Sequence, residues 1–316
     1  MAEFIVRRLI AAVPVLFLVT LIAASIMQLV PGDPAAVMAG QSASDIEIAR
    51  LREQLGLDRP FIERLGEWYL GLAHGDLGYS ILLNRPVTQA ILERVPVTLA
   101  LAGFGLFLTI ALGVPLGVIA ALRPNTWIDQ LVLTIALIGV SVPNFWLSLM
   151  LIVLFGVMLD WLPAGGYIPF GDDPVGWVRC LILPGFSLAL LQVGLLARIT
   201  RATMLEVLRQ DYVRTARAKG LPSFLVIGKH ALKNVMVPVV TVIGISFGLL
   251  LSGSVVIETV YSIPGMGRLL ANAIFGRDYP LIQGGLLITA ATLVLLNLGV
   301  DLLYALLDPR VKYGRG

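Results

Sequence analysis

The chain has 316 residues, of which 58% are hydrophobic and 14% are charged. Soluble domains carry about 25% charged residues, so this composition excludes an ordinary soluble protein and indicates a membrane protein. The net charge of +3 is too small to indicate nucleic-acid binding, and a single cysteine, Cys180, excludes an internal disulfide. The sequence has no phosphate-binding loop, paired-cysteine zinc motif or His-Glu-x-x-His motif. We therefore expect no catalytic residue, metal or bound cofactor in this chain.

Six apolar segments are candidates to cross the ~30 Å hydrocarbon core of a bilayer, which takes about 20 residues. They cover residues 9–30, 97–122, 128–159, 180–197, 235–256 and 280–307. The first is long for a signal peptide and lacks a clear Ala-x-Ala cleavage site, so we expect it to remain as a helix. The predicted fold is an all-α membrane protein with six transmembrane helices.

A more polar segment, residues 31–96, separates the first two spans. Ser44 and Glu47 have the spacing of a capping box, which starts a short helix. Residues 60–73 form a second candidate helix, in which Trp68 and Tyr69 are expected anchors at the membrane interface. The predicted organisation is an N-terminal helix (1–30), an extracytoplasmic helical insert (31–96) and a core of five spans (97–316). The segments 160–179 and 258–279 are expected to be loops.

The third span is too long for a straight crossing and contains Ser141, Pro143 and Asn144. Proline removes a helix hydrogen bond, so a kink or local unwinding is expected there. The kink fits a packing role or the gate of a pathway, and the sequence leaves both open.

The charge distribution predicts an orientation. One side carries both termini, the 123–127 turn and the 198–234 segment, with 14 Lys and Arg against six acidic residues. The other side has nine basic and 14 acidic residues. Because cytoplasmic loops are rich in Lys and Arg, we expect both termini in the cytoplasm.

The basic segment 198–234 is the most distinctive part of the chain. Met204, Leu208, Tyr212 and Ala216 recur every four residues, which predicts one helix face that turns small towards Gly220. Such a face lets another surface approach closely. The alternative is a basic loop that only sets topology and touches anionic lipid.

The same segment resembles the cytoplasmic signature loop of bacterial ABC importer permeases. Arg214-Thr215-Ala216 stands where that signature has Glu-Ala-Ala, followed by Gly220 and by Pro238 at its end. The Glu, the first Ala and a later Leu are replaced, which is typical of the dipeptide, oligopeptide and nickel branch. Pro238 is expected to start the fifth span. Further motifs that match this branch are 30–34 (VPGDP), 75–80 (GDLGYS), 141–146 (SVPNFW), 258–267 (ETVYSIPGMG), 277–281 (RDYPL) and 307–311 (LDPRV).

The resemblance covers essentially the whole chain and is closest to the first, B-type, of two permease subunits. It implies an inner-membrane importer for peptides or related solutes, built with a homologous second permease, two cytoplasmic ATPases and a periplasmic binding protein. ATP and Mg would be bound by the ATPases. In this picture residues 212–222 hold a coupling helix. Expected ATPase contacts are Tyr212, Arg214, Thr215, Ala216, Arg217, Lys219 and Gly220.

Polar residues within or beside the spans are weaker candidates for a pathway or gate. They are Ser141, Pro143, Asn144, Gln192, Glu258 and Asp301. Carboxylates in spans usually face the protein interior or water, and Asp301 also fits a structural pair with a basic residue. Glu258 could meet a substrate amine or pair with Arg268 or Arg277. The alternative function is a stand-alone secondary transporter or channel; an anchored structural protein would leave the signature loop unexplained. The substrate is not specified.

Overall fold

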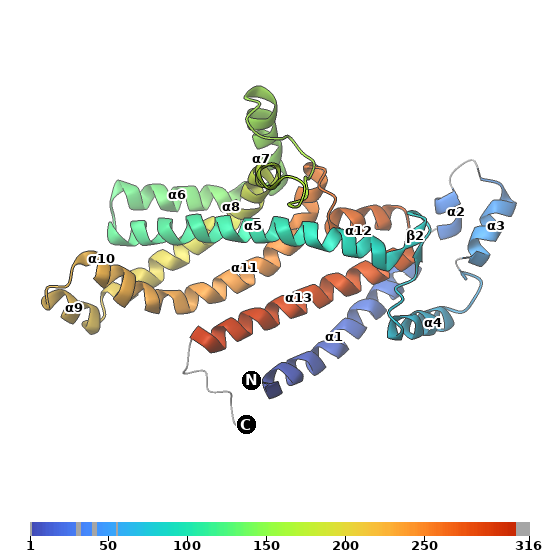
Figure 1. Cartoon of the computed structure of the whole chain (residues 1–316), viewed down its shortest axis with the longest axis horizontal. Coiled ribbons are helices and arrows are strands. Elements are labelled where there is room, and N and C mark those ends of the chain that lie inside the picture. The colour runs from blue at the N-terminus through green and yellow to red at the C-terminus, as the bar shows by residue number, and fades with distance from the viewer. Residues whose placement is uncertain (1, 30–32, 40–42, 55, 308–316) are drawn as a thin grey trace. The chain divides into compact units, whose positions relative to one another are not determined.

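A computed structural model describes residues 2–29, 33–39, 43–54 and 56–307 of the chain. It is helical apart from one two-stranded hairpin in the described residues (Figure 1). The first half contains α1 (Ala2–Leu29), α2 (Pro34–Ala39), α3 (Asp45–Gln54), α4 (Phe61–Ala73), β1 (Tyr79–Ser80), β2 (Arg85–Pro86), α5 (Val87–Leu122), α6 (Trp127–Ser141), α7 (Asn144–Leu151) and the π-helix η1 (Ile152–Met158). The second half contains α8 (Pro174–Leu208), α9 (Asp211–Ala218), α10 (Ser223–Leu225), the π-helix η2 (Val226–Ala231), α11 (Leu232–Val260), α12 (Met266–Phe275) and α13 (Tyr279–Leu307).

The described residues contain five helical segments long and apolar enough to cross a membrane. They are Ile5–Ser25, Val87–Leu122, Pro174–Leu208, Ser223–Val260 and Tyr279–Val300. A sixth crossing is the broken pair Trp127–Ser141 and Asn144–Met158, whose two halves meet at 105°. The predicted all-α fold is confirmed, and the six predicted spans correspond to these five segments and the broken pair. The predicted break at Pro143 is confirmed as well.

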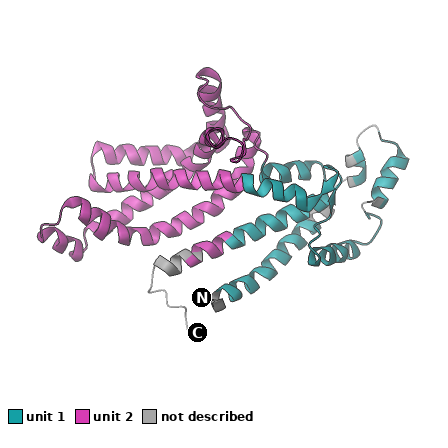
Figure 2. Ribbon diagram, in the orientation of Figure 1, with its two compact units in different colours: residues 1–97, 265–295 teal, residues 98–264, 296–316 magenta. Residues whose placement is uncertain are grey.

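The chain forms two compact units, coloured separately in Figure 2. Unit 1 consists of residues 1–97 and 265–295, and unit 2 of residues 98–264 and 296–316. Helices α5 and α13 contribute residues to both. The predicted division into 1–30, 31–96 and 97–316 placed α12 and the start of α13 apart from the 31–96 segment, whereas unit 1 holds them together.

Unit 1 has a core made from distant parts of the sequence. Its buried residues are Leu77, Val87, Ala90, Ile91, Met266, Leu269, Ala273, Leu281, Ile282 and Leu287. Asp278 closes this core, because its buried carboxylate accepts hydrogen bonds from Ser80 Oγ at 2.5 Å and from the backbone N–H groups of Leu82 and Leu281 at 3.2 Å each. The carboxylate thereby joins the hairpin to the first turn of α13. Segment 258–279 was predicted as a loop, but it contains the amphipathic helix α12.

The capping box at the start of α3 is confirmed. The backbone N–H of Ser44 donates to Glu47 Oε2 at 2.8 Å, and the N–H of Glu47 donates to Ser44 Oγ at 3.4 Å. These donors stabilise the ionised carboxylate, so the pKa of Glu47 lies below its ordinary value. The box thus satisfies backbone groups that a free helix end would leave to water.

Unit 2 is built around α8, whose apolar window is 72% buried, the highest share among the spans. Close approach is possible because small residues line its contacts. A Cβ added at Gly117 of α5 would lie 2.5 Å from the carbonyl oxygen of Ala197, and one added at Gly194 of α8 would lie 2.6 Å from that of Ala136. Helices α6, α7 and α11 also contact α8. Helix α8 is therefore the central helix of unit 2, against which the other helices pack.

Candidate functional site

A short helix, α9, follows α8 directly, and one side of it is buried in unit 2. Val213 and Ala216 pack against Val226 of η2, and Val207 and Leu208 at the end of α8 border the same cluster. An isolated helix of eight residues is marginal in water, so these apolar contacts are needed to hold α9 in place. These contacts fix α9 against the end of α8 and against η2.

The end of α9 is defined by Gly220, which has a φ of +75°. The N–H of Gly220 donates to the carbonyl of Arg217 at 2.9 Å, and that of Leu221 donates to Ala216 at 3.3 Å. These two bonds form a Schellman motif, which favours glycine because a side chain is strained at positive φ. The prediction that Gly220 forms the turn ending this helix is confirmed.

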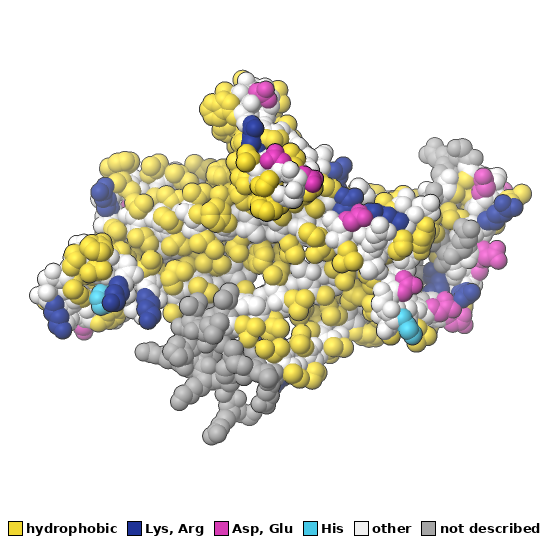
Figure 3. Space-filling model, in the orientation of Figure 1, with side chains coloured by type: hydrophobic (Ala, Val, Ile, Leu, Met, Phe, Trp, Pro, Cys, Tyr) yellow, Lys and Arg dark blue, Asp and Glu magenta, His cyan; other side chains and the backbone are white. Residues whose placement is uncertain are grey.

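The other side of α9 is exposed and basic. Its exposed residues include Tyr212, Arg214, Thr215, Arg217 and Lys219. Figure 3 shows Lys, Arg and His side chains gathered at the end of unit 2 that carries α9, beside a largely hydrophobic surface. On this side Asn234 Nδ2 donates a hydrogen bond to Tyr212 Oη at 2.9 Å, and Arg214 forms an exposed ion pair with Asp211 at 3.6 Å. An exposed pair of this kind contributes little, so the basic groups remain accessible.

The predicted continuous stripe through Met204, Leu208, Tyr212 and Ala216 is wrong. Helix α8 ends at Leu208, and Gln210 has an extended backbone with ψ of 145°, which redirects the chain. Met204 and Ala216 are buried, whereas Tyr212 is exposed. The small side of α9 thus faces its own chain, and the accessible surface is the polar one.

Sequence reasoning missed the ion pair that ties α8 to α6. Arg201 donates from Nε to Asp129 Oδ1 at 2.5 Å and from Nη2 to Oδ2 at 2.6 Å, and the N–H of Asn125 donates to the same carboxylate at 2.9 Å. Asp129 is 2% exposed. The signal was a single carboxylate at the start of the third predicted span and one of two arginines just after the fourth. The pair fixes α8 about two turns before that helix ends at Leu208.

The residues predicted at the break in the third span lie on its two sides. Ser141 ends α6 and donates to the carbonyl of Leu137 at 2.9 Å, whereas Asn144 begins α7, where its carbonyl accepts from Ser148 Oγ at 2.8 Å. Ser141 and Pro143 are exposed. The break is therefore local, and the backbone N–H of Val142 still donates to the carbonyl of Ile138 at 3.0 Å at the end of α6.

The other candidate pathway residues are distributed over α8, α11 and α13. Gln192 is buried and accepts a hydrogen bond from Ser246 Oγ at 3.1 Å. Glu258 is also buried and accepts from Thr98 Oγ1 at 2.6 Å, so it joins α11 to α5. Asp301 belongs to α13, but its side chain lies outside the described part of the structure. Gln192 and Glu258 therefore take part in helix packing.

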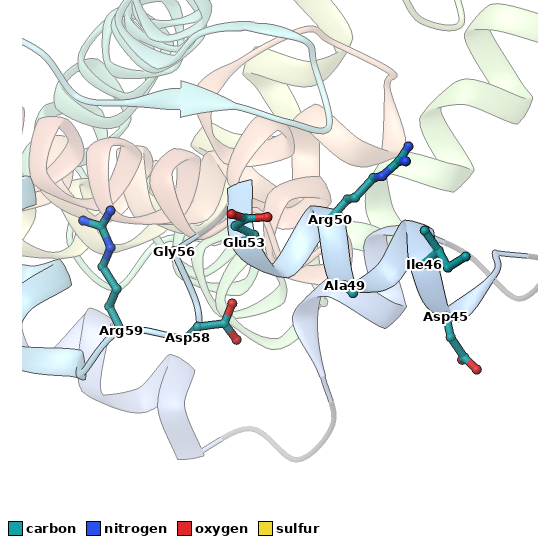
Figure 4. Close-up of a pocket in the computed structure, with 8 residues that line it drawn as sticks. All are labelled: Asp45, Ile46, Ala49, Arg50, Glu53, Gly56, Asp58 and Arg59. Atoms are coloured by element: carbon teal, nitrogen blue, oxygen red, sulfur yellow. The ribbon is translucent and has the colours of Figure 1, made fainter.

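Two hollows are lined by residues other than those of α9. One, of about 680 Å³, is lined by residues of α3 and the loop after it, and the side chains labelled in Figure 4 point in different directions instead of converging. The other, of about 310 Å³, lies between η1 and the start of α8, where Arg179 donates to the carbonyl of Trp161 at 2.9 Å. No group of three or more His, Cys, Asp or Glu that could hold a metal ion occurs in the described residues.

Bacterial relatives match the chain along almost its whole length. A Brucella abortus protein named as a candidate peptide transport system permease is 49% identical over 313 residues, which is 99% of this chain and 100% of that protein. The dipeptide transport system permease protein DppB of Alkalihalophilus pseudofirmus is 43% identical, and the glutathione transport system permease protein GsiC of Escherichia coli is 41% identical. Each comparison covers 99% of this chain and 100% of the relative.

A solved structure has the same fold. A chain of the MetNI methionine ABC transporter, in an inward-facing conformation, aligns with a TM-score of 0.57 and 18% identity, over 70% of this chain and 97% of the other. The family of binding-protein-dependent transport system inner membrane components matches residues 113–313, and the N-terminal family of the same components matches residues 1–102. These matches give no support to a stand-alone secondary transporter or channel. The chain belongs to the family of inner membrane permease components of binding-protein-dependent ABC importers.

Proposed function

We propose that this chain is the permease subunit of an ATP-driven importer for di- or oligopeptides or related small solutes, and that α9 is its contact with a cytoplasmic ATPase. The proposed substrate class rests on the names of the relatives that match along their full length. They are named as permeases of peptide, dipeptide and glutathione transport systems. A homologous second permease completes the pathway, and a periplasmic binding protein delivers the solute. In this arrangement both termini and α9 lie in the cytoplasm, as the distribution of Lys and Arg favours.

The observation that carries the proposal is the two-sided character of α9. Its inner side is held by Val213 and Ala216, whereas its outer side exposes Arg214, Thr215 and Arg217. A helix held in this way moves together with the end of α8 and with η2. A partner that pushes on the outer side of α9 would therefore move the two adjoining spans, α8 and α11.

Coupling requires that the partner binds the two states of the transporter with different free energies. Closure of an ATPase dimer supplies such a difference when its surface fits α9 in only one position of α8. Because ATP and Mg are bound by the ATPases, this chain needs no phosphate-binding loop. This chain contributes the apolar contacts that hold α9, the exposed basic surface of α9 and the connection of α9 to the spans.

The proposal is tested by substrate-stimulated ATP hydrolysis of the assembled transporter in nanodiscs. Replacing both Arg214 and Arg217 with Glu reverses the charge of the outer side without touching Val213 or Ala216. We expect stimulation to be lost while membrane insertion persists. Arg123→Glu, in the turn before α6, is the control for a change of charge elsewhere on the same side, and it should retain stimulation.

Normal stimulation in the Arg214→Glu, Arg217→Glu variant would remove α9 from the coupling path. If the wild-type chain, purified under mild conditions, brings down no ATPase, the proposal for the whole assembly fails as well. Uptake assays with labelled dipeptides, longer peptides and glutathione then separate the substrate classes. An importer that moves none of these would exclude the proposed substrate class.

A further inference from the structure

Helix α4 contacts the membrane span α1 well within the apolar part of that span. The hydroxyl groups of Tyr69 and Thr20 lie 2.7 Å apart, and the rings of Tyr69 and Phe17 are stacked with centroids 5.4 Å apart. Tyr69 Oη also donates to the carbonyl of Phe17 at 3.4 Å. All of these residues belong to unit 1. One edge of α4 is therefore fixed along α1.

The position of this contact on α1 is inside the apolar part of the span. The apolar segment predicted from the sequence covers residues 9–30, so Phe17 and Thr20 lie in its middle and not near either end. Tyr69 therefore contacts a part of α1 that lies in the hydrocarbon core when this span crosses a bilayer.

The inner face of α4 packs on the core of unit 1, through Trp68 and Leu72, beside Leu16 of α1. Next to Tyr69 on the helix surface runs a second apolar strip, made of Ile62, Gly66, Leu70 and Ala73. These positions have the i, i+4, i+8, i+11 spacing of one helix face. Ile62 is 80% exposed and Leu70 is 67% exposed. The strip is thus large, apolar and uncovered by the described chain.

Charged residues occupy the adjoining edge of the helix. Glu63 and Glu67 are exposed, and Arg59 binds Glu67 with an N–O distance of 2.6 Å. The order around the helix is therefore core-facing residues, Tyr69, the apolar strip and then the carboxylates. A helix lying in a membrane interface has this arrangement, with its charges towards headgroups and water.

We propose that α4 lies in the membrane, in the leaflet at the C-terminal end of α1, and that the Ile62–Gly66–Leu70–Ala73 strip is covered by lipid acyl chains. Lipid is the occupant that fits, because α1 beside it has an apolar window only 11% buried and exposes residues such as Val13 and Leu18 to the same surroundings. The segment between the first two spans is then partly a membrane element and not wholly a water-exposed insert. The contact of α4 with α1 anchors the start of that segment to the bilayer.

The test is site-directed spin labelling of the full chain in phosphatidylethanolamine and phosphatidylglycerol nanodiscs, alone and with any subunits that co-purify. The background is Cys180→Ala, which removes the single native cysteine. Spin labels are placed in the strip at Ile62→Cys and Leu70→Cys. The matched controls are Glu63→Cys and Glu67→Cys, which lie on the charged edge of the same helix. Gly66→Cys is a further strip position, since a Cβ there meets nothing within 4 Å. Collision rates with oxygen, which enters lipid, are compared with those for a water-soluble nickel chelate.

We expect the ratio of oxygen to nickel collisions to be several-fold higher at positions 62, 66 and 70 than at 63 and 67, in both samples. Equal nickel access on the two edges would show that the strip lies in water and would overturn the proposal. Low access of both reagents to the strip would show that protein covers it, and would overturn the proposal in favour of a subunit contact. None of these results depends on whether α9 binds an ATPase.

Discussion

Arg201 of α8 holds Asp129 of α6 through two hydrogen bonds of 2.5 and 2.6 Å, at a place where the carboxylate is 2% exposed. A buried pair of this kind repays its desolvation only through good geometry, and removal of one partner leaves a charge without compensation. The pair therefore fixes the relation of α6 to the part of α8 that leads into α9.

A double-mutant cycle measures this relation. Asp129→Ala should lower the free energy of unfolding by about 3 kcal/mol, because Arg201 is then left partly buried without its carboxylate. The double variant Asp129→Ala, Arg201→Met should lose much less than the sum of the losses of Asp129→Ala and Arg201→Met alone, because neither charge is then left without its partner. Thermal unfolding in detergent gives the values. Additive effects of the two single changes would show that the pair contributes no coupling.

Gly220 should be replaceable only at the cost of local order in α9. Gly220→Ala places a side chain at a φ of +75°, which costs about 1 kcal/mol. Hydrogen exchange of the α9 amides should accelerate about five-fold, since 1.4 kcal/mol is a factor of ten. Gly228→Ala is the control, because a Cβ there also meets nothing within 4 Å and its φ is not positive. Equal exchange in the two variants would contradict the turn assignment.

Gly117 allows α5 to approach α8 closely. Gly117→Ala brings a Cβ within 2.5 Å of the Ala197 carbonyl oxygen and 2.6 Å of Thr200 Cβ, so the helices must separate. Overpacking of this kind costs about 1–3 kcal/mol. Gly103→Ala in the same helix meets nothing within 4 Å and should be neutral or slightly stabilising. The midpoints of thermal unfolding distinguish the two, and identical midpoints would argue against close packing at Gly117.

Asp278 should stabilise unit 1 more than any one of its donors does. Asp278→Ala leaves Ser80 Oγ and two backbone N–H groups without their acceptor, and we expect a loss of about 3 kcal/mol. Ser80→Ala removes one bond and should cost about 1 kcal/mol. Limited proteolysis between β1 and β2 reports the opening of the hairpin. If Ser80→Ala opens it as readily as Asp278→Ala, the carboxylate is not the joining group.

Much of the fold follows from local sequence. Long apolar runs predict the spans, and Pro143 predicts the break because a proline in a helix removes a hydrogen bond. The predicted second and fourth spans began too late in the sequence, at residues 97 and 180. Helices α5 and α8 begin earlier, at Val87 and Pro174, because packing maintains the helix through more polar sequence there. Pro238 was expected to start the fifth span, but it lies inside α11, where it is exposed.

The site was predictable in its location and less so in its orientation. The basic segment and Gly220 indicate a short helix and its end. The turn at Arg209 and Gln210 carries neither glycine nor proline, so the break between α8 and α9 leaves no local signal. For this reason Ala216 was placed on the accessible surface, whereas its contact with Val226 buries it. The Asp129–Arg201 pair joins residues 72 positions apart and depends on the packing of α6 against α8.

The most direct test of the central proposal is photo-cross-linking from α9 in the assembled transporter. A benzophenone amino acid at Thr215, on the exposed side, should form an adduct with the ATPase that co-purifies, and the adduct yield should change when ATP is bound. The same amino acid at Asp172, in the loop before α8, should form none. An active, assembled transporter that gives no ATPase adduct from position 215 would contradict the assignment of α9 as the coupling contact.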